Sequence, residues 1–370
     1  MEQKRLGDIA TYINGYAFKP EDRGSTGLPI IRIQDLTGNA YDLGFYDGKY
    51  PEKIEINDGD VLISWSASLG VYIWNRGKGL LNQHIFKVVF DKCEVNKQYF
   101  VFAVKYKLKE MELKTHGATM KHIVKKDFDN TVIPFPTVEK QADIAYILSK
   151  IESIVEFRQQ ELQQLDDLIK ARFVELFGDP RDNSMGFEKQ KLKDSCIVVT
   201  GNTPSRAIAE YYGDYVEWIK TDNIVTGLIN PTRAKECLSE KGMEVGRIVQ
   251  KDSILMTCIA GSIASIGRVC ITDRTVAFNQ QINAIIPDRY NVLFLYVLLQ
   301  ISKNYLAEDV NMALKGILSK SKLEEKQLIV PPIELQNQFA DFVRQVDKSK
   351  LMFQKLHQKL NILQQKAGDI

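Results

Sequence analysis

The chain has 370 residues, of which 44% are hydrophobic, and this is enough for two globular cores with connecting helices. Its 49 basic and 47 acidic residues give a net charge of +2, which is too balanced for a protein that binds any polyanion without selection. A nucleic-acid contact would therefore need a fold that gathers basic groups on one face.

The cysteine and histidine content argues against a metal site. The five cysteines form no C-x-x-C pair, and only four histidines accompany them. The N-terminus carries no apolar signal segment, and the sequence holds no run of 18 apolar residues. We expect a soluble, cytoplasmic protein with reduced thiols, without a metal, a cofactor of its own or a membrane contact.

The first half begins with a strand-rich globule. Short segments of β-branched and aromatic residues, separated by Gly, Asn and Asp, predict strands. These segments are residues 28–33, 61–65, 71–74 and 85–90. Residues 99–113 then have helical spacing, and Pro134 and Pro136 mark the end of the globule.

A long helix is predicted to follow, over residues 139–177. Ile144, Ile151 and Leu165 fall on one heptad series, and Ile147, Ile154 and Leu168 fall on the series three residues later. Gly178, followed by Asp-Pro, is a helix stop. At about 1.5 Å per residue, this helix would be a rod of roughly 60 Å. Heptad spacing sustained over this length is typical of helix-on-helix packing.

The second half repeats the order of the first. Its predicted strands are residues 216–219, 254–257, 268–271 and 282–286, followed by a helix over 292–306. The last segment, residues 334–365, is again a heptad-patterned helix. Its apolar series includes Phe339, Val346 and Phe353.

Several motifs occur twice, at an offset of roughly 195 residues. Phe-Pro-Thr-Val-Glu-Lys-Gln at 135–141 corresponds to Val-Pro-Pro-Ile-Glu-Leu-Gln at 330–336, and Leu-Asn-Gln-His-Ile at 81–85 corresponds to Phe-Asn-Gln-Gln-Ile at 278–282. Two units of globule plus helix, related by a pseudo-twofold axis, would pack their helices antiparallel. The alternative is that the helices only link the two domains.

Enzyme signatures are largely missing. The sequence contains no G-x-x-x-x-G-K-[ST], H-E-x-x-H or G-x-S-x-G motif, and no glycine-rich cofactor loop. Asp288 with Glu324, Glu325 and Lys326 imitates the Asp…Glu-x-Lys of a metal-dependent nuclease, but the separation is long, and acidic pairs of this kind are typical of solvated turns. A nuclease or methyltransferase in its own right is therefore a minor alternative.

The polar inventory suits base edges and phosphates instead, since Asn and Gln pair with adenine, Arg and Lys with guanine, and Ser or Thr with either. The Asn-Gln pair common to both halves is expected to be architectural. Trp65 and Trp218 are expected in the core or in a groove wall, and His84 lacks a catalytic partner. The candidate DNA-binding residues are Asn14, Tyr16, Arg32, Gln34, Ser64, Ser66, Asn82, Gln83, His84 and Lys121 in the first half, and Asn202, Thr203, Ser205, Arg206, Lys220, Thr221, Asn223, Arg268, Asn279, Gln280, Gln281 and Lys315 in the second.

In the order of these motifs, the chain resembles the specificity subunit of type I restriction–modification systems over essentially its full length. The pieces that carry the resemblance are Thr-Gly-Asn-Thr-Pro-Ser at 200–205, Trp-Ile-Lys-Thr-Asp-Asn at 218–223, Ala-Phe-Asn-Gln-Gln-Ile at 277–282, and the segment from Ile-Pro-Phe-Pro to Leu-Phe-Gly-Asp-Pro. The first half lacks the Thr-Pro-Ser at its own opening, 14–20, so the two halves are expected to read DNA differently.

The resemblance implies an α/β fold with two mixed target recognition domains, residues 1–137 and 179–333, separated by two long antiparallel coiled-coil helices, residues 138–178 and 334–370. Each domain would read one half of an asymmetric, interrupted site in double-stranded DNA. The helices would set the spacing and dock two modification (adenine methyltransferase) subunits, around Ile144, Ile151, Leu165, Phe339, Val346 and Phe353. ATP-dependent restriction subunits would complete the complex, and this chain would catalyse nothing. The alternative is a coiled-coil scaffold with two protein-binding domains and no DNA role.

Overall fold

The two halves of the chain build their sheets in the same order. The computed structural model describes residues 2–38, 43–114, 123–308, 310 and 316–368, with only the backbone described for 112–114 and 351–368. The chain divides into a first unit, residues 1–159 with 355–370, and a second unit, residues 160–354. Each unit is described by itself below.

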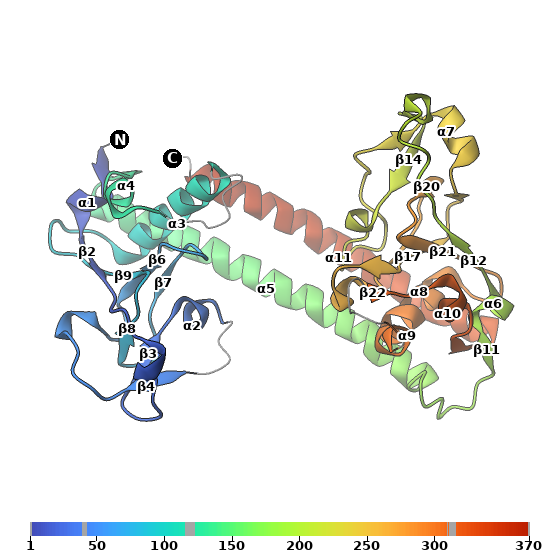
Figure 1. Cartoon of the computed structure of the whole chain (residues 1–370), viewed down its shortest axis with the longest axis horizontal. Coiled ribbons are helices and arrows are strands. Elements are labelled where there is room, and N and C mark those ends of the chain that lie inside the picture. The colour runs from blue at the N-terminus through green and yellow to red at the C-terminus, as the bar shows by residue number, and fades with distance from the viewer. Residues whose placement is uncertain (1, 39–42, 115–122, 309, 311–315, 369–370) are drawn as a thin grey trace. The chain divides into compact units, whose positions relative to one another are not determined.

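In the described part of the first unit, strands form a four-stranded antiparallel sheet in the order β2-β9-β6-β7, and a second sheet in the order β4-β3-β8-β5, in which β3 and β8 are parallel (Figure 1). β1 pairs with β10. The elements are β1 Gln3–Arg5, α1 Leu6–Ile9, β2 Thr11–Asn14, β3 Leu28–Ile31, α2 Ile33–Thr37, β4 Gly44–Tyr46, β5 Glu55–Ile56, β6 Val61–Ser64, β7 Gly70–Ile73, β8 Gly79–Leu81, β9 Ile85–Val89, α3 Lys97–Lys114, α4 Lys125–Asp129, β10 Val132–Pro134 and α5 Val138–Phe177.

In the second unit, the corresponding sheets have the orders β12-β21-β17-β19 and β13-β15-β14-β20-β16, β14 and β20 are parallel, and β11 pairs with β23. A short β18–β22 pair is added. The elements are β11 Lys189–Lys191, α6 Leu192–Ser195, β12 Cys196–Thr200, β13 Tyr212–Gly213, β14 Val216–Ile219, β15 Cys237–Leu238, α7 Glu240–Val245, β16 Ile248–Val249, β17 Ile254–Thr257, β18 Ile259–Ala260, β19 Val269–Ile271, β20 Val276–Phe278, β21 Ile282–Pro287, α8 Val292–Ile301, α9 Lys303–Ala307, β22 Gly316–Ile317, α10 Lys320–Glu324, β23 Gln327–Ile329 and α11 Ile333–Gly368.

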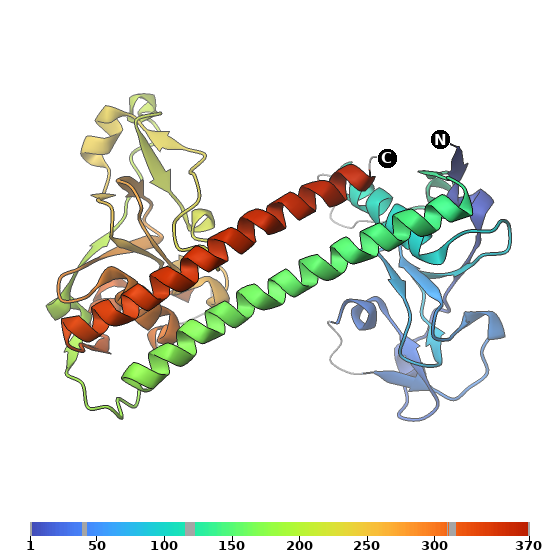
Figure 2. The same ribbon diagram turned by 180° about the vertical axis from the view of Figure 1, so that it is seen from behind.

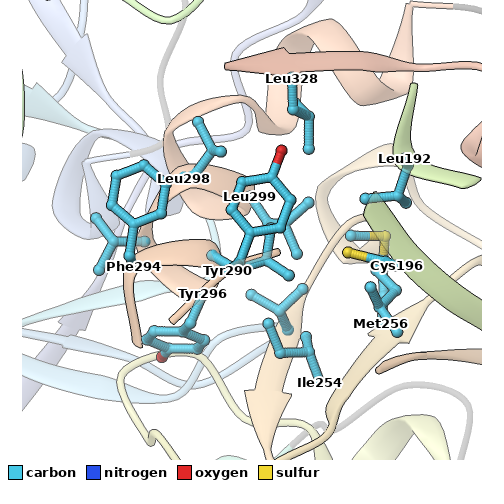
Figure 3. Packing of buried hydrophobic residues seen from close by; sticks show 14 of the residues in the cluster. Leu192, Cys196, Ile254, Met256, Tyr290, Phe294, Tyr296, Leu298, Leu299 and Leu328 are labelled. Carbon is cyan, nitrogen blue, oxygen red and sulfur yellow. The ribbon is translucent and has the colours of Figure 1, made fainter. Parts of the chain in front are cut away.

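The central strands β6 and β17 are apolar at almost every position because both of their faces are covered. Side chains alternate between faces along a strand. Val61 and Ile63 therefore belong to one core and Leu62 to the other. In β17, Ile254 and Met256 likewise pack into the larger core, and Leu255 packs into the smaller one. Figure 3 shows the larger core of the second unit, where Ile254 and Met256 lie beneath side chains that include Phe294 and Leu298.

In the second unit, the end of α5 and the start of α11 run side by side in opposite directions (Figures 1 and 2). The Phe173 and Phe339 rings lie 5.5 Å apart between centroids, and Asp166 pairs with Lys350 at 2.5 Å, so that residue numbers fall along one helix as they rise along the other. Phe177 and Phe294 complete the aromatic cluster, with ring centroids 4.8 Å apart. All four phenylalanines are fully buried.

A buried glutamine joins the first turn of each long helix to its own globule. In the first unit, the Gln141 side chain accepts a hydrogen bond from the Asn96 backbone N–H at 2.9 Å and donates one to the Pro136 carbonyl at 2.9 Å. In the second unit, Gln336 makes the same two bonds with Asn291 and Pro331, at 2.9 and 2.8 Å. The duplicated Pro-to-Gln motif is therefore a structural latch that fixes where each helix begins.

The fold class expected from the sequence is confirmed: two sheet-containing α/β regions are joined by the long helices α5 and α11. The predicted strands are present, with small changes at their ends. One predicted helix differs, because 292–306 is divided at Ser302 into α8 and α9. The hydroxyl-bearing Ser302 is buried and its N–H still bonds Leu298.

One edge of β14 carries a half-buried ion-pair cluster. Arg274 binds both carboxylate oxygens of Glu217, at 2.8 and 2.7 Å, and the Ala234 N–H and Arg233 add further bonds at 2.9 and 2.5 Å. Burial alone would raise the pKa of Glu217, but these hydrogen bonds outweigh it and lower the pKa to about 2. The cluster ties β14 to the 231–234 loop.

We expect Gln336→Ala to lower the free energy of unfolding by about 1–3 kcal/mol, because the Asn291 N–H and the Pro331 carbonyl lose their buried partner. Chemical denaturation of the full chain measures this. Gln338→Ala, at an exposed position of the same helix, serves as the control and should change stability by less than about 0.5 kcal/mol. Equal effects of the two substitutions would contradict the latch.

We expect Glu217→Gln to destabilise the protein by about 2 kcal/mol at neutral pH, because Arg274 loses its charged partner. The pKa of Glu217 is lowered on folding, so its contribution is present above 4.5 and is lost as the pH falls towards 2. The difference in melting temperature between wild type and variant should therefore shrink over that interval. A difference that stays constant with pH would argue against this charge effect, and Glu175→Gln, in an exposed helix pair, provides the reference.

Candidate nucleic-acid interface

The same turn follows the parallel strand of each unit. The Arg32 N–H bonds the Asp35 carboxylate at 2.8 Å, and the Lys220 N–H bonds the Asn223 side-chain oxygen at 3.0 Å. Asp35 and Asn223 are buried, and the Asn223 amide also donates to Thr232 and to the Arg233 carbonyl, each at 3.1 Å. Asn223 is thus held inside by the turn. Of the other predicted residues in these turns, Thr221 is half-buried and Gln34 is exposed.

A second shared feature is a close approach of two loops at the end of β2 and of β12. A Cβ on Gly15 would lie 2.0 Å from the Asn82 carbonyl oxygen, and one on Gly201 would lie 2.2 Å from that of Asn279. Only glycine fits such an approach. The Asn82 side chain accepts from the Gln83 N–H at 2.9 Å, and that of Asn279 accepts from the Gln281 N–H at 3.1 Å.

These contacts give Asn82 and Asn279 a structural role in both units. The glutamines beside them, Gln83 and Gln280, are exposed and free to differ in what they contact. Thr203 donates a hydrogen bond to Gln280, which joins two of the predicted site residues. Asn202 is occupied internally, since its amide bonds the Val245 carbonyl and the Arg247 N–H, both at 2.8 Å.

In the second unit, two predicted cations gather over aromatic rings. The Arg206 guanidinium lies 4.4 Å from the Tyr212 ring centroid and 5.2 Å from that of Trp218, and the Lys220 ammonium lies 4.9 Å from Trp218. Glu236 pairs with both cations. We call these five residues the Arg206–Glu236 cluster. Ser205 lies next to it and is exposed.

Sequence reasoning missed Glu236 altogether. It lies between β14 and the two-residue strand β15, in a segment without a motif, and its partners come from 16 and 30 residues away. The pKa of Glu236 lies below its usual value because Lys220 and Arg206 donate hydrogen bonds to it. The carboxylate is therefore ionised at neutral pH.

In the first unit, a different group of side chains lies next to the glycine approach, directly after β6. The Trp65 indole N–H donates to the Asn14 side chain at 3.3 Å, and its ring packs edge-on against His84, with centroids 4.9 Å apart, and stacks on Phe86 at 5.5 Å. His84 has a positive φ of 71°. Nearby, Tyr16 is 42% exposed and packs against Phe18. This group is aromatic and amide in character, and the first unit has Arg32 at the place of Lys220, where it pairs with Asp35.

The remaining predicted residues are scattered. Ser64 is fully buried and donates to the Ser68 carbonyl at 2.5 Å, and Ser66 is also buried. Arg268 donates to Ser265 at 2.7 Å, next to Lys303, whose pKa is lowered by burial and by Arg268. Lys121 and Lys315 lie outside the described residues.

The residues proposed for partner docking have mixed environments. Phe339 and Val346 are buried in the chain's own second core, with Leu165 packed against it. Ile144 and Ile151 are half-buried, and Phe353 lies in the part of α11 whose side chains are not described. In the other heptad series of α5, Ile147 and Ile154 are exposed by 55% and 42%. That series was expected to pack within the chain, and it does not.

Three features would be typical of other protein classes: a metal site, a nuclease motif and a membrane-spanning helix. Among the side chains that the structure describes, in residues 2–38, 43–111, 123–308, 310 and 316–350, no three of His, Cys, Asp or Glu are grouped to hold a metal ion. Glu325, from the acidic pair that imitates a nuclease motif, forms ion pairs with Lys191 and Lys193 at 2.6 and 2.5 Å. None of the helices in these same ranges combines the length and the apolar content that crossing a membrane requires.

Known proteins are similar to this chain in sequence and in fold. The EcoBI specificity subunit of a type I restriction enzyme from Escherichia coli is 24% identical over 374 residues, which are 92% of this chain and 78% of that protein. The HindI specificity subunit from Haemophilus influenzae is 34% identical over 118 residues, 31% of this chain and 25% of that protein.

Two solved structures have the same fold. The S subunit of a type I restriction–modification system from M. genitalium superposes with a TM-score of 0.57 at 14% identity, covering 99% of this chain and 94% of that chain. A chain from a structural study of complex assembly and conformational transition of the type I R-M system gives 0.56 at 15% identity, covering 100% and 96%.

The family model agrees with the duplication found in the sheets. The type I restriction modification DNA specificity domain matches residues 1–167 and 185–364, so each match contains one globule and most of the helix that follows it. The resemblance drawn from the duplicated motifs is thereby confirmed. The chain belongs to the family of type I restriction–modification DNA specificity subunits, whose members are not catalytic and leave the chemistry to partner subunits.

Proposed function

We propose that this specificity subunit reads an asymmetric, bipartite site in double-stranded DNA, with one target recognition domain, residues 1–137 or 179–333, for each half. One observation carries the proposal: the same scaffold is built twice but presents different polar groups. The glycine approach and the strand-end turn are common to both units. The Arg206–Glu236 cluster and the Trp65 group are not. Two unlike readers on like scaffolds suit a site whose halves differ.

The exposed candidates supply the chemistry for base edges and phosphates. Amide side chains can bond adenine, guanidinium and ammonium groups can bond guanine or phosphate, and hydroxyls can bond either. The exposed set is Asn14, Tyr16, Gln34 and Gln83 in the first domain and Thr203, Ser205, Arg206 and Gln280 in the second. The buried Ser64 and Asn223 would support these loops from inside.

We further propose that residues 138–178 and 334–370 set the distance between the half-sites. A spacer of tens of Å suits readers separated by one or more DNA turns, at about 34 Å per turn. Two modification subunits would bring S-adenosylmethionine and methylate adenine, and restriction subunits would bring ATP. The complex would act in the cytoplasm, and this chain would hold no cofactor itself.

The docking face for the modification subunits is best sought on the exposed side of α5 in the first unit. Tyr146, Ile147, Ile154 and Phe157 are 66%, 55%, 42% and 65% exposed. At 100° per residue, these four lie on one side of the helix. An apolar stripe of this kind on an exposed helix is typical of a surface that a partner helix covers.

The alternative, a scaffold without a DNA role, makes a different prediction about salt. Binding through phosphate contacts releases counterions, so the affinity of the assembled complex for its DNA site should fall steeply between about 50 and about 200 mM salt. A complex built on a scaffold without a DNA role would not bind the DNA site at any of these salt concentrations.

We expect the double substitution Ile147→Asp with Phe157→Asp to weaken association with the modification subunits by about tenfold or more, because two apolar contacts are replaced by charges. Analytical ultracentrifugation of the mixture measures this. Val174→Asp places a charge at a position 49% exposed on the opposite side of α5 and should leave association unchanged. Equal association of all three proteins would contradict docking on this stripe.

We expect that exchanging residues 190–330 for those of a relative alters one half of the methylated sequence and leaves the other half intact. Methylome sequencing of cells that carry the hybrid subunit reads both halves at once. The reciprocal exchange of residues 1–137 is the control and should alter only the other half. If either exchange changed both halves, the model of two independent readers would be wrong.

A further inference from the structure

Glu236 binds two cations of the kind that bind DNA phosphates. Its carboxylate pairs with Arg206 at 2.5 Å through one oxygen and with Lys220 through the other. Arg206 and Lys220 are both among the residues that the sequence predicts to contact DNA. A phosphate offers the same anionic oxygens as a carboxylate, so the two compete for these donors.

Both cations also contact aromatic rings. Arg206 lies against the faces of Tyr212 and Trp218, and Lys220 lies over Trp218. The rings themselves are fixed, because the Tyr212 hydroxyl donates to the Pro204 carbonyl at 2.7 Å and the Trp218 N–H donates to the Asn202 carbonyl at 3.2 Å. Cation–π contact and the carboxylate together define one position for both charges.

An ordinary surface ion pair does not have these properties. Glu210 and Lys241 pair at 2.5 Å with both side chains 69% exposed, and neither has a ring contact among those described. By comparison, the side chains of Arg206, Glu236 and Lys220 are 55%, 37% and 31% exposed. Glu236 thus bridges two cations that both lie against aromatic rings, whereas Glu210 pairs with one exposed lysine.

We infer that Glu236 is a specificity-determining residue of the second target recognition domain. It withholds Arg206 and Lys220 from DNA that offers a phosphate alone, and it keeps the Arg206 guanidinium oriented for a matching half-site. Non-matching DNA must displace a carboxylate that binds both cations, and it offers them only one phosphate in return. A matching half-site supplies base and phosphate acceptors together. Discrimination of this kind lowers the affinity for non-matching DNA and does not depend on raising the affinity for the matching half-site.

The test uses the full chain assembled with its modification subunits and substitutes Glu236→Gln, which keeps the shape and removes the charge. Fluorescence anisotropy compares a duplex with the methylated sequence and a duplex with its second half-site scrambled. We expect affinity for the scrambled duplex to rise about fivefold and its salt dependence to steepen by about one phosphate contact. Affinity for the intact site should change by about twofold or less, so the specificity ratio falls.

Glu210→Gln is the matched control, since it removes the same charge from the same unit. If it raised the affinity for scrambled DNA as much as Glu236→Gln does, net charge would explain the effect and the inference would fail. It would also fail if Glu236→Gln weakened both duplexes equally, since that is the mark of a merely structural residue.

A second background separates the remaining cases. With Arg206→Gln and Lys220→Gln already present, adding Glu236→Gln should no longer raise the affinity for scrambled DNA beyond the Glu210→Gln control. A persistent rise would overturn the inference, because Glu236 would then act through other groups. The inference rests on the proposed function, and a wild-type complex that bound both duplexes equally would refute that function itself, whatever the variants did.

Discussion

Each long helix is held to its globule by one buried amide side chain. Gln141 and Gln336 are fully buried, and each bridges the backbone that precedes its own helix and the backbone at the start of α3 or α8. A buried amide that lost these partners would be costly, so the direction in which each helix leaves its globule is tightly constrained. If the helices measure a distance on DNA, these two junctions set the accuracy of the measurement.

The same separation between fixed and variable parts holds in the loops. The glycine approaches at Gly15 and Gly201, and the turns at Arg32 and Lys220, keep equivalent backbone in equivalent places. The side-chain groups near this backbone differ: Trp65 packs against His84 in one unit, and Arg206 packs against Trp218 in the other. Under the proposed function, the variable side chains would contact DNA, and the constant backbone would keep them in place.

Much of the fold could be predicted from the sequence because its signals are local. The apolar runs of β6 and β17 indicate strands covered on both faces, and the heptads of α5 and α11 indicate long helices. The break at Ser302 has no such signal, since the apolar pattern continues across it. A heptad pattern also does not indicate which element covers its apolar side chains. Ile147 and Ile154 were therefore expected to pack against another helix of the chain, but they lie exposed.

The candidate site was predicted less well, for a related reason. Residue types suited to bases could be found in the loops, but whether each one faces inward depends on partners that are distant in sequence. Asn202 and Asn223 use their amides within the chain, through Val245 and Thr232. Glu236 gains its importance from Arg206 and Lys220, which reach it only after β14 and β15 have paired. Local sequence patterns indicate which residue types suit DNA, but only the fold shows which of these side chains are already bonded within the chain.

The aromatic cluster of the second unit has a consequence for synthesis of the chain. Phe173 and Phe177 come from α5, Phe294 from α8, and Phe339 from α11, so this core draws on segments separated by more than a hundred residues. During translation, the first two rings leave the ribosome long before the last one exists. The nascent chain therefore carries an uncovered apolar surface until α11 emerges, and a message truncated before residue 333 would yield a product prone to aggregation and recognition by chaperones.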